Sequence, residues 1–165
     1  MKKKILLLIG NKNVGSKILK KLKSYSFVDS EILTSDKTFN KTGIKFLENK
    51  KQFILRLSRK KKFDFLISIY WPWLIPKNLF SKFKNSINFH PSYLPVARGF
   101  YPHAHAIIKN LKWGVSLHKI SDGIDKGNVW CQKKLNMINF LPQLAFTKKE
   151  KLKSSNYLIK IFLKY

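Results

Sequence analysis

The chain has 165 residues, which suits a single domain with a buried core. Hydrophobic residues make up 44% of the sequence, which argues against an intrinsically disordered chain, and no apolar run is long enough to suggest a membrane span. The formal net charge is +26, but only three of the 34 basic residues are arginine, the residue that base-reading proteins favour. A solvated lysine coat and a surface that faces polyanions therefore both remain open.

The first part of the chain predicts a strand, a helix and a second strand. The apolar run Lys4–Ile9 predicts a buried strand rather than a secretory signal, because it stops at Gly10 and no small-residue cleavage site follows. Apolar residues at helical spacing predict a helix over Val14–Leu22, and Glu31–Thr34 predicts a short second strand.

The middle of the chain predicts a helical region and two further strands. Apolar residues interspersed with lysine over 44–57 predict one long helix, or two short ones, ending near Lys62. The apolar runs Phe63–Ile69 and Ser86–Phe89 predict buried strands. Between them, the two prolines in residues 71–80 exclude a central strand and predict a loop followed by one helical turn.

The last part of the chain predicts one helix, two strands and a final helix. The helix covers Pro102–Asn110, the strands cover Gly114–Ile120 and Asn128–Leu135, and the last helix lies in the lysine-rich tail from Thr147. The alternation of strands and helices predicts an α/β, Rossmann-like fold in a single domain, with a mostly parallel sheet covered by helices on both faces.

The loops after Ile9, Ile69 and Phe89 are the candidate ligand sites, because ligands bind such sheets beyond the carboxyl ends of the strands. The first loop holds Gly10 and Asn11 but matches neither G-x-G-x-x-G nor a P-loop. Two interpretations of it stay open, a plain strand-to-helix turn and a turn whose backbone N–H groups bind an anion.

Groups that exchange protons near neutral pH are concentrated in one region. All four histidines fall within 29 residues, from His90 to His118, and two carboxylates, Asp122 and Asp125, follow closely. Alternate residues of a strand face the same side, so Asn88 and His90 project together from a strand end. An amide, an imidazole and a carboxylate meeting there would suit acyl transfer.

The remaining histidines and the single cysteine do not predict a metal site. His103 and His105 are two residues apart on a predicted helix, a spacing that points them to different faces. Partly exposed imidazoles at a helix start are the simpler interpretation. Cys131 alone excludes an internal disulfide framework and a cysteine cluster, and it favours a cytoplasmic setting.

Two blocks of sequence resemble the paired signature of the 10-formyltetrahydrofolate-dependent formyltransferases. The first is "INFHPSYLPVARG", which is similar to Asn-x-His-Pro-Ser-Leu-Leu-Pro followed by a basic residue and Gly. The second is "GVSLHKISDGIDKGNV", which is similar to Gly-Val-Thr followed by a loop with Asp-x-Gly. Tyr93 and Ser116 are mild departures from Leu and Thr. The family includes glycinamide ribonucleotide, methionyl-tRNA and sugar-nucleotide N-formyltransferases.

The resemblance implies formyl transfer from 10-formyltetrahydrofolate to a primary amine through a tetrahedral intermediate. It implies that Asn88 and protonated His90 stabilise the oxyanion, and that Asp125 helps to remove a proton from the amine. It implies no metal. The residues expected to bind the folate co-substrate are Trp71, Trp73, Leu74, Ile75, Asp122 and Gly123. For Trp71 and Trp73, packing as core aromatic residues is an equally good interpretation. The residues expected to bind the acceptor are Gly10, Asn11, Ser92, Arg98 and Gly99.

The resemblance leaves the acceptor open. The turn "GNKNVGSK" is a poor match for the phosphate turn of glycinamide ribonucleotide enzymes, and no tRNA-binding domain follows before Tyr165. We therefore expect a nucleotide-linked amino sugar as a small-molecule acceptor, with methionyl-tRNA, glycinamide ribonucleotide and an inactive polyanion-binding relative as alternatives. We expect a catalytic domain over 1–135 and a short lysine-rich tail over 136–165, which is compatible with a truncated chain. We also expect a cytoplasmic protein with no membrane partner, for which a homodimer is a compatible assembly.

Overall fold

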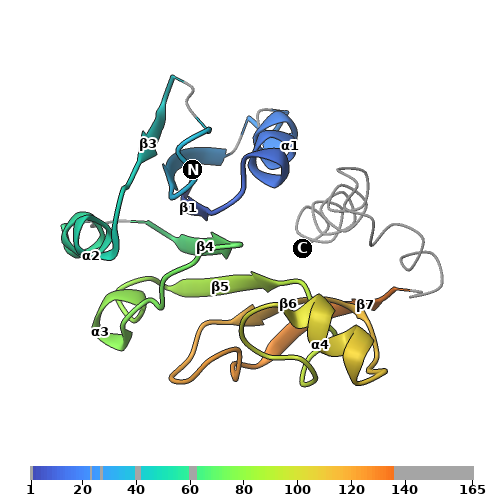
Figure 1. Ribbon diagram of the computed structural model, residues 1–165. Coiled ribbons are helices and arrows are strands. Elements are labelled where there is room, and N and C mark those ends of the chain that lie inside the picture. The colour runs from blue at the N-terminus through green and yellow to red at the C-terminus, as the bar shows by residue number, and fades with distance from the viewer. Residues whose placement is uncertain (1, 23, 27, 40–41, 60–62, 136–165) are drawn as a thin grey trace. The chain divides into compact units, whose positions relative to one another are not determined.

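The protein is described from a computed structural model, which describes residues 2–22, 24–26, 28–39, 42–59 and 63–135 (Figure 1). The chain divides into two compact units, Met1–Asn88 and Phe89–Tyr165. Strand β5 (Asn85–His90) contributes residues to both units. In these described ranges, no helix has the length and apolar character needed to cross a membrane. The predicted tail over 136–165 lies outside the described residues.

The first unit is built on parallel strands in the order β3-β2-β1-β4-β5. The four strands that precede β5 are β1 (Lys3–Ile9), β2 (Val28–Thr34), β3 (Ile44–Phe46) and β4 (Phe65–Ile69). Leu7 of β1 lies opposite Ile32 of β2 on one side and Ile67 of β4 on the other. Residues 5–9 of β1 are all buried, as expected for a strand of a parallel sheet that is covered on both faces.

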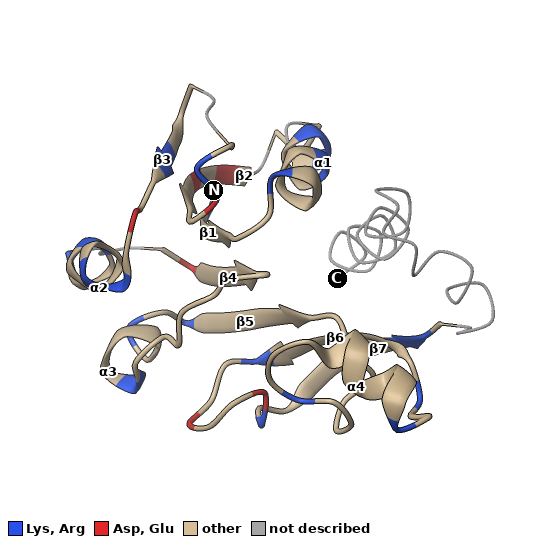
Figure 2. Ribbon diagram, viewed as in Figure 1, with Lys and Arg blue, Asp and Glu red and all other residues tan. Residues whose placement is uncertain are grey.

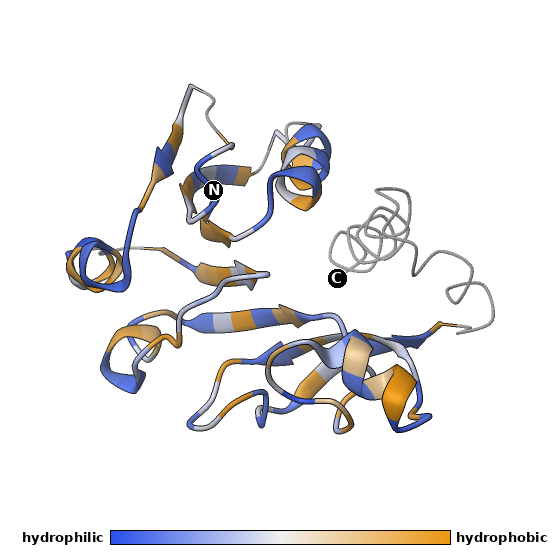
Figure 3. Ribbon diagram, in the orientation of Figure 1, coloured by the Kyte–Doolittle hydropathy of each residue, from blue (hydrophilic) through white to orange (hydrophobic). Residues whose placement is uncertain are grey.

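Three helices connect these strands, α1 (Lys12–Leu22), α2 (Lys50–Ser58) and the single turn α3 (Lys77–Phe80). The crossover through α1 leads from β1 to one side of the sheet, and the crossover through α2 leads back to β4 on the other side. Because parallel crossovers are right-handed, α1 and α2 cover opposite faces. Both helices carry apolar and hydrophilic residues in Figure 3, as helices with one buried face do.

One predicted element is wrong. The helical region expected from residue 44 begins instead with β3, where Ile44 lies opposite Ile32 of β2. The helix α2 starts only at Lys50, after the side chain of Asn49 accepts a hydrogen bond from the N–H of Gln52 at 3.0 Å. A three-residue strand is too short to show a period of its own, so its apolar residues were absorbed into the helical pattern.

The second unit contains the end of β5, then α4 (Pro102–Ile108), β6 (Gly114–Lys119) and β7 (Val129–Lys134). The strand order is β5-β6-β7, and β6 and β7 are antiparallel with Leu117 opposite Cys131. A β-bulge interrupts this register between Leu117 and His118. The strands are mostly parallel and alternate with helices, so the predicted α/β class is confirmed.

Basic side chains outnumber acidic ones in the described part of each unit. Figure 2 shows lysine and arginine on helices, loops and strand ends of both units. Within the described part of the second unit, the acidic residues are Asp122 and Asp125 alone, and both lie in the loop between β6 and β7. Asp125 therefore supplies one of only two carboxylates in the described part of a unit whose other charged side chains are basic.

Candidate active site

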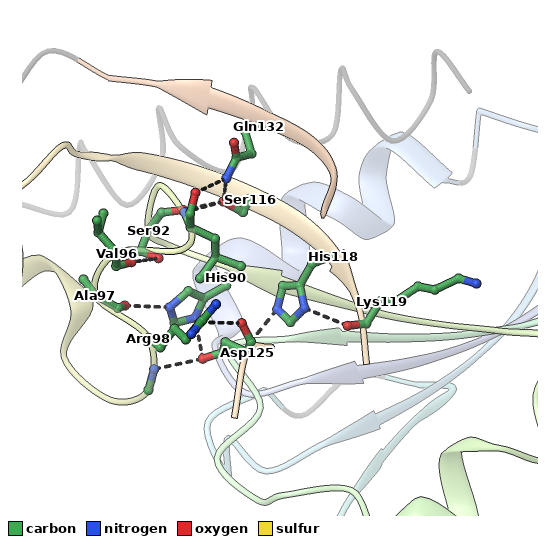
Figure 4. A network of polar contacts seen from close by, with 12 residues as sticks. His90, Ser92, Val96, Ala97, Arg98, Ser116, His118, Lys119, Asp125 and Gln132 are labelled. Carbon is green, nitrogen blue, oxygen red and sulfur yellow. Dashed lines mark hydrogen bonds and ion pairs between the residues drawn. The ribbon is translucent and has the colours of Figure 1, made fainter. Parts of the chain in front are cut away.

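His90 is the last residue of β5, and the fold buries it. Its neighbours Ile87 and Phe89 are buried core residues of the same strand, and His90 itself is only 5% exposed. The ring nitrogen Nε2 lies 3.0 Å from the carbonyl oxygen of Ala97. The other nitrogen, Nδ1, lies 3.4 Å from Oδ2 of Asp125. Both polar atoms of the ring are thus directed at protein oxygens (Figure 4).

Asp125 is held in place by the backbone of the loop that follows β5. Its Oδ2 accepts a hydrogen bond from the N–H of Gly99 at 2.9 Å. Its main-chain carbonyl accepts a second one from Nε of Arg98 at 3.1 Å. The carboxylate therefore occupies a defined position at the end of β5, although Asp125 itself comes from the loop between β6 and β7 (Figure 4).

His118 reaches the same carboxylate from β6. Its Nε2 lies 3.3 Å from Oδ1 of Asp125, and its Nδ1 lies 2.8 Å from the carbonyl oxygen of Lys119. The side chain is 2% exposed, and the β-bulge next to it is a feature that often redirects a side chain beside a functional site. Asp125 is therefore bracketed by two imidazoles, one on each carboxylate oxygen.

Burial and hydrogen bonding shift the pKa values of this cluster in opposite ways. Burial lowers the pKa of His90, and the carboxylate of Asp125 and the carbonyl of Ala97 offset only part of that effect. Burial by itself would raise the pKa of Asp125, but the hydrogen bond from His118, the charge of His90 and the N–H of Gly99 together lower it. Asp125 is thus held as a carboxylate, and the neutral form of His90 is favoured.

The cluster has more acceptors than two neutral rings have protons. The nitrogens of His90 and His118 face the carbonyls of Ala97 and Lys119 and the two oxygens of Asp125. A neutral imidazole carries a single N–H, so neutral rings leave two of these contacts without a proton. The arrangement can therefore take up a proton at the carboxylate side and hold it between the three residues, as general acid–base chemistry requires.

Strained backbone surrounds the cluster. Ala97, Tyr101 and Asp125 all adopt left-handed conformations, with φ of 51°, 51° and 50°. Left-handed backbone disfavours residues with a Cβ and is concentrated at functional sites. Two of these residues contact the imidazoles directly, Ala97 through its carbonyl and Asp125 through its carboxylate.

Comparison of the whole sequence with known families identifies the family of the chain that carries this cluster. A family model described as formyl transferase matches residues 6–160. The chain belongs to the formyl transferase family. The resemblance inferred from the two sequence blocks is therefore confirmed.

Two curated relatives illustrate the range of this family. The chain is 35% identical over 99 residues to methionyl-tRNA formyltransferase of Coprothermobacter proteolyticus, a match covering 55% of this chain and 33% of that protein. It is 30% identical over 73 residues to dTDP-4-amino-4,6-dideoxyglucose formyltransferase of Mycobacterium tuberculosis, covering 44% of this chain and 31% of that protein. The matched region spans about a third of the length of these relatives.

Solved structures of the family share the fold. A 4-N formyltransferase from Francisella tularensis superposes with a TM-score of 0.71 at 27% identity, covering 81% of this chain and 57% of that one. A phosphoribosylglycinamide formyltransferase from Bacillus halodurans superposes with a TM-score of 0.65 at 18% identity, covering 96% and 88%. The second likeness concerns the fold alone.

The predicted catalytic residues of this formyl transferase chain are Asn88, His90 and Asp125, and the structure shows a contact between the last two. His90 and Asp125 lie side by side, with Nδ1 of His90 3.4 Å from Oδ2 of Asp125. Asn88 lies on the same strand as His90 and is half-buried, but it belongs to the first unit. Its catalytic role stays a prediction.

Two of the predicted folate-binding residues form an aromatic cluster in the first unit. The rings of Trp71 and Trp73 meet edge to face with centroids 5.1 Å apart, and Phe53 of α2 lies 5.0 Å from Trp71 and 5.9 Å from Trp73. Leu74 is 62% exposed and Ile75 is half-buried in the same loop. The indole Nε1 of Trp71 is buried and makes no hydrogen bond with the residues described.

The predicted acceptor-binding residues fall into two groups. Gly10 and Asn11 lie in the turn between β1 and α1, in the first unit. Ser92, Arg98 and Gly99 lie in the loop after β5, in the second unit. Arg98 and Gly99 contact Asp125, whereas Ser92 is fully buried and donates its hydroxyl to the carbonyl of Val96 at 3.0 Å.

The predicted folate contacts Asp122 and Gly123 lie in the loop between β6 and β7, and both are exposed. His103, for which no metal was expected, packs its ring edge to face against Trp113 with centroids 6.3 Å apart, and His105 is exposed. In the ranges that the structure covers, no group of three or more His, Cys, Asp or Glu residues is arranged to hold a metal ion.

Sequence reasoning missed His118 as a member of the site. A signal for it was present, because His118, like His90, lies at or next to the end of a buried strand. Two further residues, Ser116 and Gln132, hold the loop after β5. No pattern in the sequence pointed to that role for Gln132.

Proposed function

We propose that this chain transfers a formyl group from 10-formyltetrahydrofolate to a primary amine. The observation that carries the proposal is the buried His90–Asp125–His118 cluster, in which a carboxylate is bracketed by two imidazoles at 3.4 Å and 3.3 Å. Membership of the formyl transferase family supplies the reaction class for that cluster.

The cluster suits the proton transfers of this reaction. Attack of the amine nitrogen on the formyl carbon forms the new C–N bond and places negative charge on the formyl oxygen and positive charge on the amine. Asp125 accepts the amine proton, directly or through water, and Oδ2 can share it with Nδ1 of His90. Asn88 is the donor to the oxyanion, and His90, once protonated, stabilises it through its positive charge. The tetrahedral intermediate then expels the folate N10, which takes up a proton.

The folate is best accommodated by the predicted aromatic loop. Trp71 and Trp73 present flat apolar faces, which suit a heterocycle. The buried Nε1–H of Trp71 lacks a partner in the part of the chain described, and a buried donor of this kind favours a ligand that supplies an acceptor. Asp122 and Gly123 stay predicted contacts of the same co-substrate.

A nucleotide-linked amino sugar is the acceptor we favour. The first backbone N–H groups of α1 are all used within the chain: that of Lys12 by Oδ2 of Asp36 at 2.7 Å, and those of Asn13 and Val14 by Oδ1 of Asn11 at 3.1 Å and 3.2 Å. These groups are not left for an acceptor phosphate, which disfavours a ribonucleotide held at this helix start. The likeness to a dTDP-amino-sugar formyltransferase supports the same choice.

The proposal is tested by release of tetrahydrofolate from 10-formyltetrahydrofolate. Three acceptors are compared: dTDP-4-amino-4,6-dideoxyglucose, glycinamide ribonucleotide and methionyl-tRNA. We expect turnover with the sugar nucleotide, and a loss of about 100-fold or more in kcat for Asp125→Asn and for His90→Gln. His105→Gln, which changes an exposed histidine of the same unit, is the matched control and keeps the wild-type rate.

Each outcome has a defined meaning. Faster turnover with either of the other acceptors overturns the choice of acceptor and leaves formyl transfer in place. Wild-type rates in both site variants overturn the mechanism. No tetrahydrofolate release with any acceptor, together with RNA binding that weakens steeply with salt, would identify the inactive polyanion-binding alternative instead.

A further inference from the structure

The loop Ser92–Ala97 is held by two side chains from neighbouring strands. Ser116 of β6 donates its hydroxyl to the carbonyl of Ser92 at 2.7 Å and accepts the N–H of Leu94 at 3.1 Å. Gln132 of β7 donates from Nε2 to the carbonyl of Leu94 at 2.6 Å and to the hydroxyl of Ser116 at 3.1 Å. Figure 4 draws this network together with the His90–Asp125 contact.

These contacts use the full hydrogen-bonding capacity of both side chains where they meet. A serine hydroxyl has one donor and two acceptor positions, and all three are engaged at Ser116, which is fully buried. The Nε2 of Gln132 has two hydrogens, and both have acceptors. The nitrogen of the Gln132 amide, rather than its oxygen, must point to the loop, because the oxygen would be repelled by the carbonyl oxygen of Leu94.

The held loop ends at the residue that contacts His90. The hydroxyl of Ser92 donates to the carbonyl of Val96 at 3.0 Å, and the N–H of Val96 donates to Tyr93 at 3.2 Å, so the restraint extends along the loop. Ala97 follows in a left-handed conformation, and its carbonyl lies 3.0 Å from Nε2 of His90. Left-handed backbone at an alanine persists only where the surroundings impose it.

We propose that Gln132, acting through Ser116, is a positioning residue for His90: it fixes the loop 92–97 so that the carbonyl of Ala97 orients the imidazole toward Asp125. For turnover this inference rests on the proposed function, but the orientation of the ring does not depend on it. Gln132 lies on β7, and its Nε2 contacts the carbonyl of Leu94 and the hydroxyl of Ser116, so its action on His90 is indirect.

The kinetic test compares variants that remove or keep these donors. Gln132→Met is close in size and loses both N–H groups, and Gln132→Glu places a carboxylate oxygen against the carbonyl of Leu94. We expect kcat to fall about 10- to 100-fold in both, with little change in the KM of the acceptor, because the loss is one of orientation. Lys134→Met, an exposed residue of the same strand, is the matched control and keeps wild-type kinetics.

A second pair of variants separates positioning from general damage to the core. Ser116→Ala removes the shared hydroxyl and is expected to behave like Gln132→Met. Ser116→Thr keeps the hydroxyl and is expected to restore kcat to within about three-fold of wild type, since the donor and both acceptor positions are retained. Equal loss in Ser116→Ala and Ser116→Thr would overturn the proposal.

The decisive test reads His90 itself by NMR titration of the histidine rings, with its signal assigned from His90→Gln. Asp125 and His118 are the titratable groups whose charges act on His90. Because the carbonyl of Ala97 supports the protonated ring, its displacement in Gln132→Met lowers the pKa of His90 further, while Lys134→Met leaves the titration unchanged. A folded Gln132→Met protein with the wild-type titration of His90 overturns the proposal.

Folding and the proposed function are controlled separately. Cooperative unfolding in urea and unchanged circular dichroism establish that each variant is folded, and if Gln132→Met is not, the titration is read on Ser116→Ala. A wild-type protein that releases no tetrahydrofolate contradicts the proposed function alone, since the titration still tests the positioning of His90.

Discussion

Each ring nitrogen of His90 faces an oxygen that the fold places there, the carbonyl of Ala97 on one side and the carboxylate of Asp125 on the other. The ring is nevertheless buried, and burial opposes its charge more than the two oxygens favour it. In the free protein His90 is therefore kept as a neutral base beside an ionised carboxylate. We propose that negative charge developing in a bound reactant shifts this balance toward a protonated ring.

The lowered pKa of His90 predicts a stability that depends on pH. Its folded-state pKa lies below the ordinary value of 6.5, so the unfolded chain binds more protons as the pH falls through that value. The free energy of unfolding therefore decreases from about pH 7.5 to pH 5.5. His90→Gln removes this contribution, and we expect a shallower decrease, measured by urea unfolding at several pH values.

Asp125 acts in a different range and does not confuse this measurement. Its folded-state pKa lies below 3.8, so its contribution to stability is present above that value and is lost only as the pH falls through the lower folded-state pKa. A wild-type slope equal to that of His90→Gln between pH 5.5 and 7.5 would contradict the burial of a neutral His90.

At the scale of elements, the connection between β6 and β7 positions the site. This loop closes where the N–H of Lys119 donates to the carbonyl of Asn128 at 2.9 Å. A Cβ at Gly127 would clash with the carbonyl oxygen of Lys119, so no side chain fits there without moving the backbone. Asp125 lies two residues earlier in the same loop, so the close approach at Gly127 helps to set the position of its carboxylate.

Gly127→Ala is therefore expected to destabilise the protein by about 1–3 kcal/mol, because the added methyl group meets backbone rather than a flexible side chain. Gly43→Ala is the matched control. Gly43 has φ +83° with nothing within 4 Å of an added Cβ, so that change costs only the left-handed strain, about 1 kcal/mol. Urea unfolding measures both, and a smaller effect at Gly127 than at Gly43 would contradict this account.

At the scale of the whole molecule, the net charge of +26 is the dominant feature. With 8 acidic residues against 34 basic ones, the carboxylates are too few to neutralise the basic side chains. Like charges repel more strongly in a compact chain than in an expanded one, so the folded state carries a cost that dissolved salt reduces.

The free energy of unfolding is accordingly expected to rise as NaCl increases from about 20 mM to about 300 mM, where the Debye length falls to roughly 6 Å. Thermal unfolding followed by circular dichroism measures the change. An equal concentration of a neutral solute such as glycerol, which does not screen charge, is the control and should give a smaller effect. A melting temperature that is flat or decreases over this range would contradict the repulsion argument.

Much of the architecture and the identity of the chemical groups were readable from the chain alone. Continuous apolar runs such as Lys4–Ile9 are long enough to indicate a buried strand without knowledge of its neighbours, and His90 and Asp125 stand in blocks whose order is typical of a family. Ile44–Phe46 was not recognisable, because three residues have no period and become a strand only through pairing with β2.

The remaining features depend on contacts between segments far apart in the chain. His118 meets Asp125, and Gln132 meets Leu94, through the antiparallel pairing of β6 with β7 and the bulge beside His118. A one-residue change of register would turn each of these side chains to the opposite face, and no local pattern specifies that register. The sequence was therefore sufficient to predict His90 and Asp125 as reactive groups. Only the tertiary structure determined which oxygen atom each ring nitrogen of His90 and His118 faces.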